Sequence, residues 1–145
     1  MSAQVLLIED NPGDVRLARE AFHGAKIASH LHVVYDGVEA LDFLRHEGTH
    51  TSAPRPDLIL LDLNLPKMDG RAVLDQIKKN EGLKAIPIVV ITSSEAETDV
   101  LQSYQLKANC YLSKPFQLEA FEKILNAISD FWLVRAKLPQ QMQTG

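Results

Sequence analysis

The sequence has one cysteine, no excess of positive charge and no long apolar run. Cys110 alone cannot form a disulfide within the chain, which favours a reducing compartment. The net charge of −4 argues against broad affinity for nucleic acid or anionic membranes. The start, Met1-Ser2-Ala3-Gln4, lacks the features of a signal peptide, and no apolar run approaches the roughly 18 residues that span a bilayer. These absences predict a cytoplasmic protein that binds neither nucleic acid nor membrane.

The rest of the composition is ordinary for a globular protein, with 46% hydrophobic and 23% charged residues among 145. This length fits one domain with a buried core. No internal repeat, low-complexity tract or linker divides the sequence. Only the end, with Pro139 and several glutamines, has the composition of a flexible tail. We therefore expect a single domain over residues 4–134, followed by a flexible tail over residues 135–145.

Short aliphatic runs alternate with segments of helical periodicity. The expected strands are Val5–Ile8, Leu31–Val34, Leu58–Leu61, Ile86–Ile91 and Cys110–Leu112. The expected helices begin near Pro12, Gly37, Gly70, Glu95 and Gln117, and Val38 is among the residues expected to pack. Nearly unbroken aliphatic strands are typical of a parallel sheet covered on both faces. The alternation therefore predicts an α/β fold with a five-stranded parallel sheet and five helices.

Two further features receive ordinary structural interpretations. The connection from His46 to Pro56 is longer than the usual loop of about 2–6 residues between a helix and a strand. It contains Gly48 and Pro54, so we expect it to be exposed and irregular. The five histidines are scattered over expected helices, strands and loops. We expect them to be surface residues and not metal ligands.

Polar side chains stand at the ends of four expected strands. Glu9 and Asp10 follow the first strand, Asp62 ends the third, Thr92 follows the fourth and Lys114 lies after the fifth. In a parallel sheet these ends share one edge, where open α/β sheets bind ligands. Each acid alone is explained as well by a helix N-cap or a turn. Their coincidence at one edge favours a functional site.

This set of residues suits a divalent metal and a phosphoryl group. Mg²⁺ prefers oxygen ligands in near-octahedral geometry. Asp10 and Asp62 would supply carboxylates, Glu9 would bind through a water, and a backbone carbonyl near Asn64 would complete the protein ligands. Asp62 could then attack phosphorus, since carboxylates form aspartyl phosphates. The amine and hydroxyl at the other strand ends would neutralise phosphoryl oxygens, because such catalysis is mainly positioning and charge neutralisation.

On these residues the sequence resembles the receiver domain of bacterial two-component response regulators. Asp62 matches the family's phosphoacceptor, and Glu9-Asp10 match its acidic pair, although Asp is commoner at the position of Glu9. The segment 65–70, Leu-Pro-Lys-Met-Asp-Gly, looks like the family's proline-x-methionine-x-glycine turn. Lys114-Pro115 is similar to its lysine–proline step, which is usually cis. The resemblance implies a flavodoxin-like, doubly wound fold.

The resemblance also implies a mechanism. A sensor histidine kinase would transfer a phosphoryl group from its phosphohistidine to Asp62, with Mg²⁺ bound. The implied phosphoryl-contacting and switch residues are Thr92, Ser93, Tyr111 and Lys114. Phosphorylation would shift the population between two states and change which partners bind. The protein would thus be a signalling switch that phosphorylates and slowly dephosphorylates itself, and not an enzyme acting on an external substrate.

More narrowly, the sequence looks like the single-domain regulators that pair with bacterial and cyanobacterial phytochrome kinases. The features that carry this likeness are the long connection ending in residues 53–66 and the extended last helix. A phosphorelay intermediate serving a kinase other than a phytochrome is the alternative within the same family.

The last helix carries two apolar stripes. One of them has the 4-3-4-3 spacing of a helix seam and contains Ala120, Ile124, Ala127, Phe131 and Val134. One stripe can pack on the sheet, which leaves the other in need of cover. We expect a homodimer through Ile124, Ala127, Phe131 and Val134. The alternative is a single broad stripe buried within the monomer.

Two other classes of function remain open from the residues. An aspartyl-nucleophile phosphatase of the haloacid dehalogenase type would share the fold and metal. It usually has a second Asp two residues after the nucleophile, and that position is Asn64 here. A flavin- or dinucleotide-binding module would need a phosphate-cradling loop after the first strand. Glu9 and Asp10 place two negative charges there instead.

Overall fold

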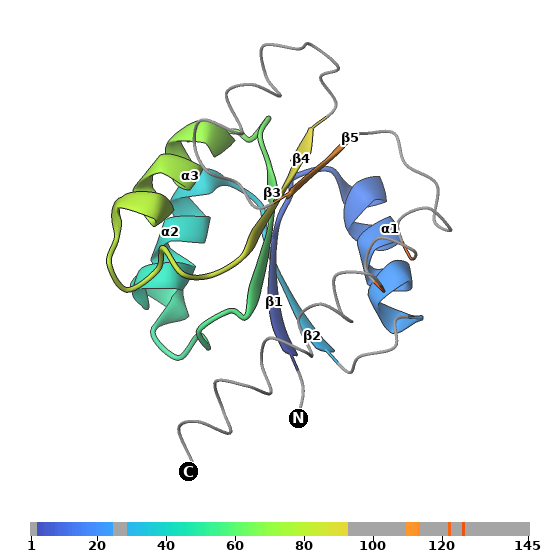
Figure 1. Cartoon of the computed structure of the whole chain (residues 1–145), viewed down its shortest axis with the longest axis horizontal. Coiled ribbons are helices and arrows are strands. Elements are labelled where there is room, and N and C mark those ends of the chain that lie inside the picture. The colour runs from blue at the N-terminus through green and yellow to red at the C-terminus, as the bar shows by residue number, and fades with distance from the viewer. Residues whose placement is uncertain (1–2, 25–28, 93–109, 114–121, 123–125, 127–145) are drawn as a thin grey trace.

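A parallel sheet organises the chain. The computed structural model describes residues 3–24, 29–92, 110–113, 122 and 126. Within these ranges the strand order is β2-β1-β3-β4-β5, and every neighbouring pair is parallel (Figure 1). The strands are β1 (Ala3–Ile8), β2 (Ser29–Val34), β3 (Leu58–Asp62), β4 (Ile88–Thr92) and β5 (Cys110–Ser113). The predicted parallel α/β fold is therefore confirmed.

Three helices and one short 3-10 helix accompany the strands in the described ranges. They are α1 (Pro12–His23), α2 (Gly37–Arg45), η1 (Gly48–His50) and α3 (Gly70–Lys79). Helices predicted to begin near Glu95 and Gln117 lie outside the described residues, except that residues 122 and 126 are helical. In the part of the chain that the structure describes, no helix combines the length and the apolar character needed to cross a bilayer.

Each α-helix begins at a side-chain cap that the local sequence supplies. The Asp14 amide donates to Asn11 Oδ1 at 3.1 Å at the start of α1. The Glu39 amide donates to Asp36 Oδ1 at 2.8 Å at the start of α2. Asp69 caps α3 in the same way. These caps satisfy backbone N–H groups that have no partner within the helix, and they fix where each loop ends.

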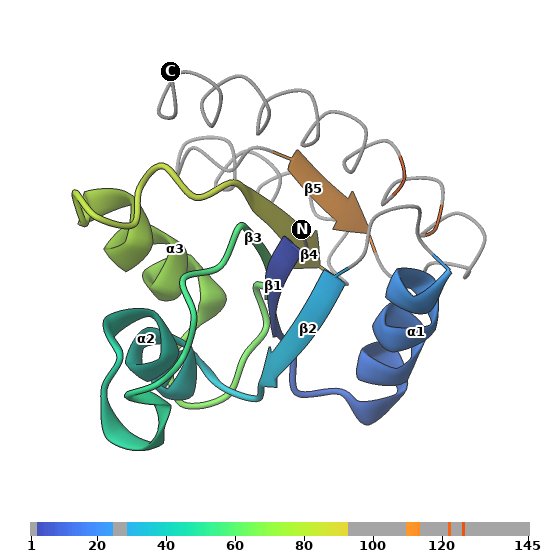
Figure 2. The same ribbon diagram turned by 90° about the horizontal axis from the view of Figure 1, so that it is seen from below.

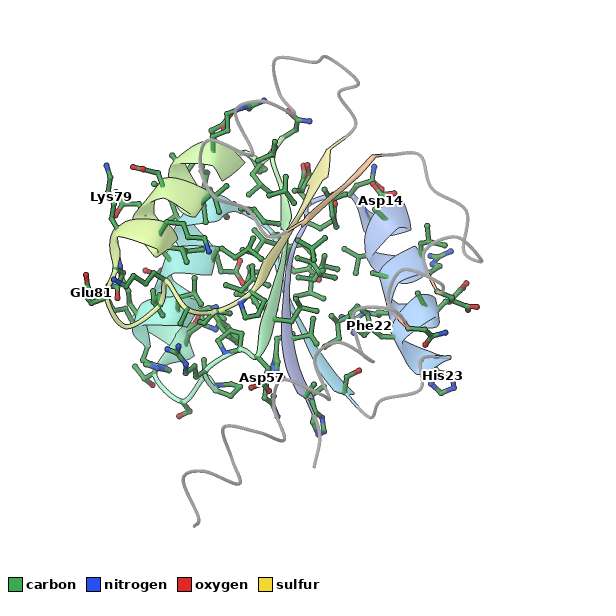
Figure 3. The ribbon with its side chains drawn as sticks, in the orientation of Figure 1. Asp14, Phe22, His23, Asp57, Lys79 and Glu81 are labelled. Atoms are coloured by element: carbon green, nitrogen blue, oxygen red, sulfur yellow. The ribbon has the colours of Figure 1, made fainter. Side chains whose placement is uncertain are left out.

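The helices cover both faces of the sheet. Figures 1 and 2 show α1 on one face and α2 with α3 on the other. Alternate residues of β1 divide between the two resulting cores: Leu6 and Ile8 pack with the α2–α3 side, while Leu7 packs with the α1 side. Phe22 lies between α1 and the sheet (Figure 3). Burial on both faces explains the aliphatic strands and fixes their register.

Val38 was predicted to pack and does not, since 48% of its surface is exposed. Residues advance by about 100° around a helix, so the buried stripe of Ala40, Phe43 and Leu44 leaves Val38 nearly opposite. The spacing of apolar residues predicted the helix correctly but not which of them face the core.

The expectation that the histidines lie on the surface is met by His23, His30 and His46, which are exposed, and only in part by His32 and His50, which are half-buried. Both rings pack at a tilt against buried Phe43, with centroid separations of 5.5 and 5.3 Å. His32 Nε2 also lies 2.7 Å from Gln4 Oε1. Burial, assisted by neighbouring His30, lowers the pKa of His32. The connection from His46 to Pro56 is exposed at most of its positions, as expected, but it contains η1 and its last residue, Pro56, is buried.

Candidate functional site

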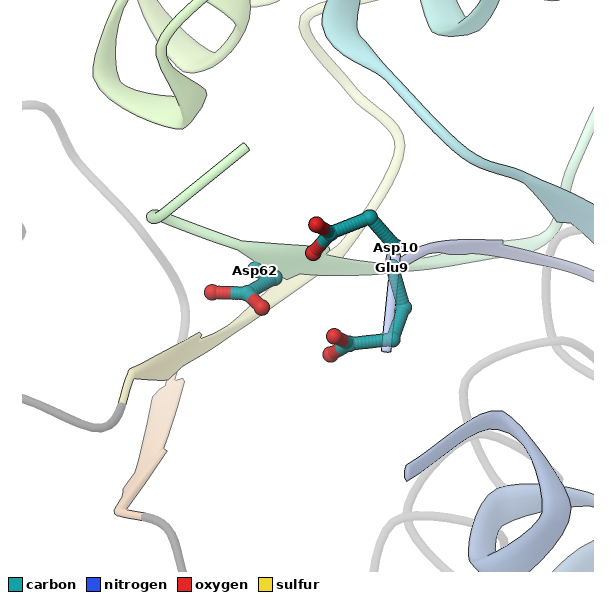
Figure 4. A group of neighbouring side chains, drawn as sticks. All are labelled: Glu9, Asp10 and Asp62. Atoms are coloured by element: carbon teal, nitrogen blue, oxygen red, sulfur yellow. The ribbon is translucent and has the colours of Figure 1, made fainter. Parts of the chain in front are cut away.

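Three carboxylates meet at the carboxyl edge of the sheet. Glu9 and Asp10 directly follow β1, and Asp62 is the last residue of β3. The two strands are neighbours, with Ile8 paired to Leu61. One oxygen from each carboxylate lies within 4.8 Å of the others, and Figure 4 shows the three side chains around one space. The sequence therefore predicted correctly that these acids would converge.

Burial separates the three acids into two kinds. Glu9 is only 1% exposed and Asp62 only 4%, whereas Asp10 is exposed. The Asn11 amide donates to Glu9 Oε1 at 3.1 Å, and the Asn64 amide donates to Asp62 Oδ1 at 2.9 Å. Carboxylates that are buried close together repel one another unless protons or a cation compensate their charge. An all-oxygen donor set with one solvent-facing member suits a hard divalent cation that keeps some of its waters.

The β3–α3 loop (residues 63–69) brings the start of α3 against the backbone of Asp62. The Gly70 amide donates to the Leu63 carbonyl oxygen at 3.0 Å. A methyl group on Gly70 would stand 2.6 Å from Leu63 Cα and would also overlap the Asp62 carbonyl oxygen. The first residue of α3 therefore packs directly on the backbone of the candidate nucleophile. This close approach requires glycine at position 70.

The remaining predicted residues are placed only in part. Asp62 pairs with Ile91 of β4, and Thr92 pairs with Ser113 of β5, so the ends of β3, β4 and β5 share one edge. Tyr111 lies within β5. Ser93, Lys114 and Pro115 lie outside the described residues, as do Ile124, Ala127, Phe131 and Val134. Their predicted roles stay predictions.

Sequence reasoning missed one contact beside the site. Lys67 Nζ, in the β3–α3 loop, lies 3.4 Å from Oδ2 of Asp36, the residue that caps α2. Lys67 has a φ of 63°, in the left-handed region that is uncommon for a side chain other than glycine. The Asp-Gly pair at residues 36–37 signals a helix start, but nothing in the sequence links it to a loop some thirty residues away.

Known proteins match this chain over most of its length. The family model of the response regulator receiver domain matches residues 5–126. The response regulator Rcp1 of Synechocystis sp. is 47% identical over 135 residues, which are 93% of this chain and 92% of Rcp1. The probable methanogenesis regulatory protein FilR2 of Methanothrix harundinacea is 42% identical over 89% of this chain and 83% of its own length.

Two solved structures show the same arrangement of elements. The phosphorylated cyanobacterial phytochrome response regulator RcpA aligns with a TM-score of 0.83 and 46% identity, covering 92% of this chain and 95% of RcpA. The Mn²⁺-bound form of Rcp1 aligns with a TM-score of 0.81 and 47% identity, covering 90% of this chain and 94% of Rcp1. Similarity of this extent indicates that this chain shares with both proteins the fold and the position of the carboxyl edge of the sheet.

Proposed function

The chain belongs to the response regulator receiver family, and we propose that Asp62 is the residue that accepts the phosphoryl group from a sensor histidine kinase. As a response regulator homologous to Rcp1 and RcpA, this chain signals through phosphorylation. The observation that carries the assignment is the buried carboxylate of Asp62 at the end of β3, beside Glu9 and Asp10. Membership of this family also disfavours the phosphatase and flavin-binding alternatives.

The geometry around Asp62 suits nucleophilic attack on phosphorus. In the transfer, an Asp62 carboxylate oxygen forms a bond to phosphorus while the bond from phosphorus to the kinase histidine nitrogen breaks. The Asn64 amide, 2.9 Å from Oδ1, orients the carboxylate. We propose that Lys114 and Thr92, with Ser93, contact phosphoryl oxygens, and that Tyr111 moves as Thr92 does. The register that brings Thr92 to the same edge as Asp62 supports this arrangement.

We propose Mg²⁺ as the natural cofactor. A divalent cation would neutralise charge on the carboxylates and on the incoming phosphoryl group. Asp10, Asp62 and the Asn64 backbone carbonyl would be its direct ligands, and Glu9 would act through a water. The clustering of the three carboxylates supports a divalent site. A Mn²⁺-bound form of the relative Rcp1 supports it independently.

Replacing Asp10 by asparagine tests the metal site. We expect the dissociation constant for Mn²⁺ to rise by about 10–100-fold. Even the loss of a group that only hydrogen-bonds to a metal ligand commonly weakens metal binding by that much. Calorimetric titration measures the affinity, and the mass gained with Mn²⁺ and a small acyl phosphate measures phosphorylation. Asp14→Asn is the matched control, since Asp14 is a nearby acid in the first turn of α1 but lies outside the carboxylate group. Equal effects of the two variants would contradict the assignment.

We propose that the partner kinase is a phytochrome, supported by likeness to RcpA and Rcp1. The alternative is a relay for another kinase, and the 42% identity to FilR2, a probable methanogenesis regulator, favours it. Comparing initial phosphotransfer rates from a phytochrome kinase and from unrelated kinases separates the two. A preference for an unrelated kinase would favour the relay.

We also propose a cytoplasmic homodimer, without nucleic-acid or membrane partners, formed through Ile124, Ala127, Phe131 and Val134. Their seam-like spacing in the sequence supports it. We further propose that the domain spans residues 4–134 and that residues 135–145, which lie outside the described residues, form a flexible tail. Sedimentation at micromolar concentration should give the mass of a dimer. A monomer, with and without a phosphoryl analogue, would contradict the proposed dimer.

A further inference from the structure

The β3–α3 loop contains a strained turn at Lys67. The Met68 amide donates to the Pro66 carbonyl oxygen at 2.7 Å, which closes a three-residue turn around Lys67. Lys67 has a φ of 63°. A γ-turn with positive φ at its centre is rare and strained, and such backbone persists only where the surroundings hold it. Contacts from neighbouring elements are therefore needed to hold the turn at Lys67.

The start of α2 contacts the turn in two ways. Asp36 Oδ2 lies 3.4 Å from Lys67 Nζ, while its other oxygen, Oδ1, caps α2 through the Glu39 amide. The Glu39 hydrogen bond, with the ammonium of Lys67, holds the pKa of the Asp36 carboxyl below its ordinary value. A methyl group on Gly37 would stand 2.5 Å from the Met68 carbonyl oxygen and 2.7 Å from Met68 Cβ. The backbone of α2 therefore lies directly against the turn.

Both ends of the same loop reach the nucleophile. Before the turn, the Asn64 amide donates to Asp62 Oδ1. After it, the Gly70 amide donates to the Leu63 carbonyl oxygen. Because the intervening segment is only a few residues long, we expect a shift at residues 66–68 to move at least one of these contacts. The contacts thus form a continuous path from Asp36 to Asp62.

We propose that the start of α2 positions the phosphorylation site, with Asp36 and Gly37 holding the strained turn at Lys67 and, through the β3–α3 loop, the Asp62 carboxylate and Asn64 carbonyl. Asp36, Gly37 and Lys67 are positioning residues, because they act through the loop and not on the phosphoryl group. The inference rests on the proposed function, since it concerns how the proposed metal and phosphoryl ligands are placed.

Three substitutions separate the contributions. Asp36→Asn keeps a side chain that caps helices well and removes the charge that faces Lys67. Lys67→Ala removes the amine and keeps the strained backbone. Lys67→Gly also removes the amine, but glycine adopts positive φ readily, so the turn no longer needs to be held. Asp75→Asn is the control, because it breaks another ion pair between an exposed lysine and an aspartate, Lys79 Nζ to Asp75 Oδ2 at 2.9 Å on α3.

The experiment measures Mn²⁺ affinity by calorimetry, and amide hydrogen exchange in metal-free protein at Met68 and Gly70. For Asp36→Asn and Lys67→Ala we expect the dissociation constant and both exchange rates to rise by about 2–5-fold, the size of an exposed ion pair. Lys67→Gly should stay within about twofold of wild type in both. The double variant Asp36→Asn/Lys67→Gly should match Lys67→Gly, and Asp75→Asn should match wild type.

The outcomes distinguish failure of the positioning role of Asp36 from failure of the proposed function. If Asp36→Asn changes neither affinity nor exchange, or if its effect simply adds to that of Lys67→Gly, the positioning role of Asp36 is overturned. Equal effects of Asp75→Asn and Asp36→Asn would also overturn it, because they would indicate a general charge effect. If wild type binds no Mn²⁺ and gains no phosphoryl mass, the proposed function fails and the inference falls with it.

Discussion

Replacing Asp62 by asparagine is expected to abolish phosphorylation, lowering its rate by at least about a thousandfold, the scale seen when a catalytic nucleophile is lost. An amide is a far poorer nucleophile than a carboxylate, and no other acid of the group occupies the end of β3. The fold should survive, because asparagine has nearly the same volume. Its amide oxygen can still accept the hydrogen bond from the Asn64 amide. Losing one charge from three close carboxylates also relieves repulsion.

The measurement is intact mass after incubation with Mg²⁺ and a small acyl phosphate, with thermal unfolding as the check on the fold. Asp57→Asn is the control on the same segment. Asp57 precedes β3 at its opposite end, where its Oδ2 accepts from the Gln4 amide at 2.8 Å (Figure 3). The Asp57→Asn protein should gain the full phosphoryl mass. A folded Asp62→Asn protein that still gains the mass would remove Asp62 from its proposed role.

The fold and the carboxylate group could be predicted because both follow from local patterns with a common physical cause. Strands such as Leu58–Asp62 are buried on both faces, so their aliphatic runs are conspicuous in the sequence. Parallel pairing then brings every strand's carboxyl end to one edge. That is why Glu9, Asp10 and Asp62 could be placed together without knowing any side-chain geometry.

The features that sequence reasoning missed depend on contacts between distant segments. His32 and His50 are partly covered because both meet Phe43, and their spacing in the sequence carries no sign of this. The pairing of Asp36 with Lys67 arises from packing of α2 on the β3–α3 loop. Val38 followed the helical pattern of apolar residues and still faces outward. Periodicity predicts an element, whereas the neighbour of a given side chain depends on how elements pack.

Replacing Gly70 by alanine is expected to give the largest loss of stability among single-methyl changes near the site. The added Cβ would stand 2.6 Å from Leu63 Cα and 2.9 Å from the Leu63 carbonyl oxygen, and it would overlap the Asp62 carbonyl oxygen. All three are backbone atoms, so no side-chain rotation can relieve the overlap. Forcing extra atoms into close packing costs about 1–3 kcal/mol, occasionally more. Urea unfolding measures this cost.

The same overlap should weaken the site, because the backbone that moves away from the new methyl group is that of Asp62 and Leu63. We expect Mn²⁺ affinity to fall together with the free energy of unfolding. Gly82→Ala is the matched control: its Cβ would meet only the Asn80 side-chain oxygen at 3.3 Å, and this oxygen, which accepts from the Gly82 amide, needs to shift by only a few tenths of an ångström. That change should stay within about 0.5 kcal/mol of wild type, as surface substitutions usually do. If Gly70→Ala were as mild as Gly82→Ala, α3 would not press on the nucleophile's backbone, and Asp62 would have to be held by the Asn64 amide and its strand pairing instead.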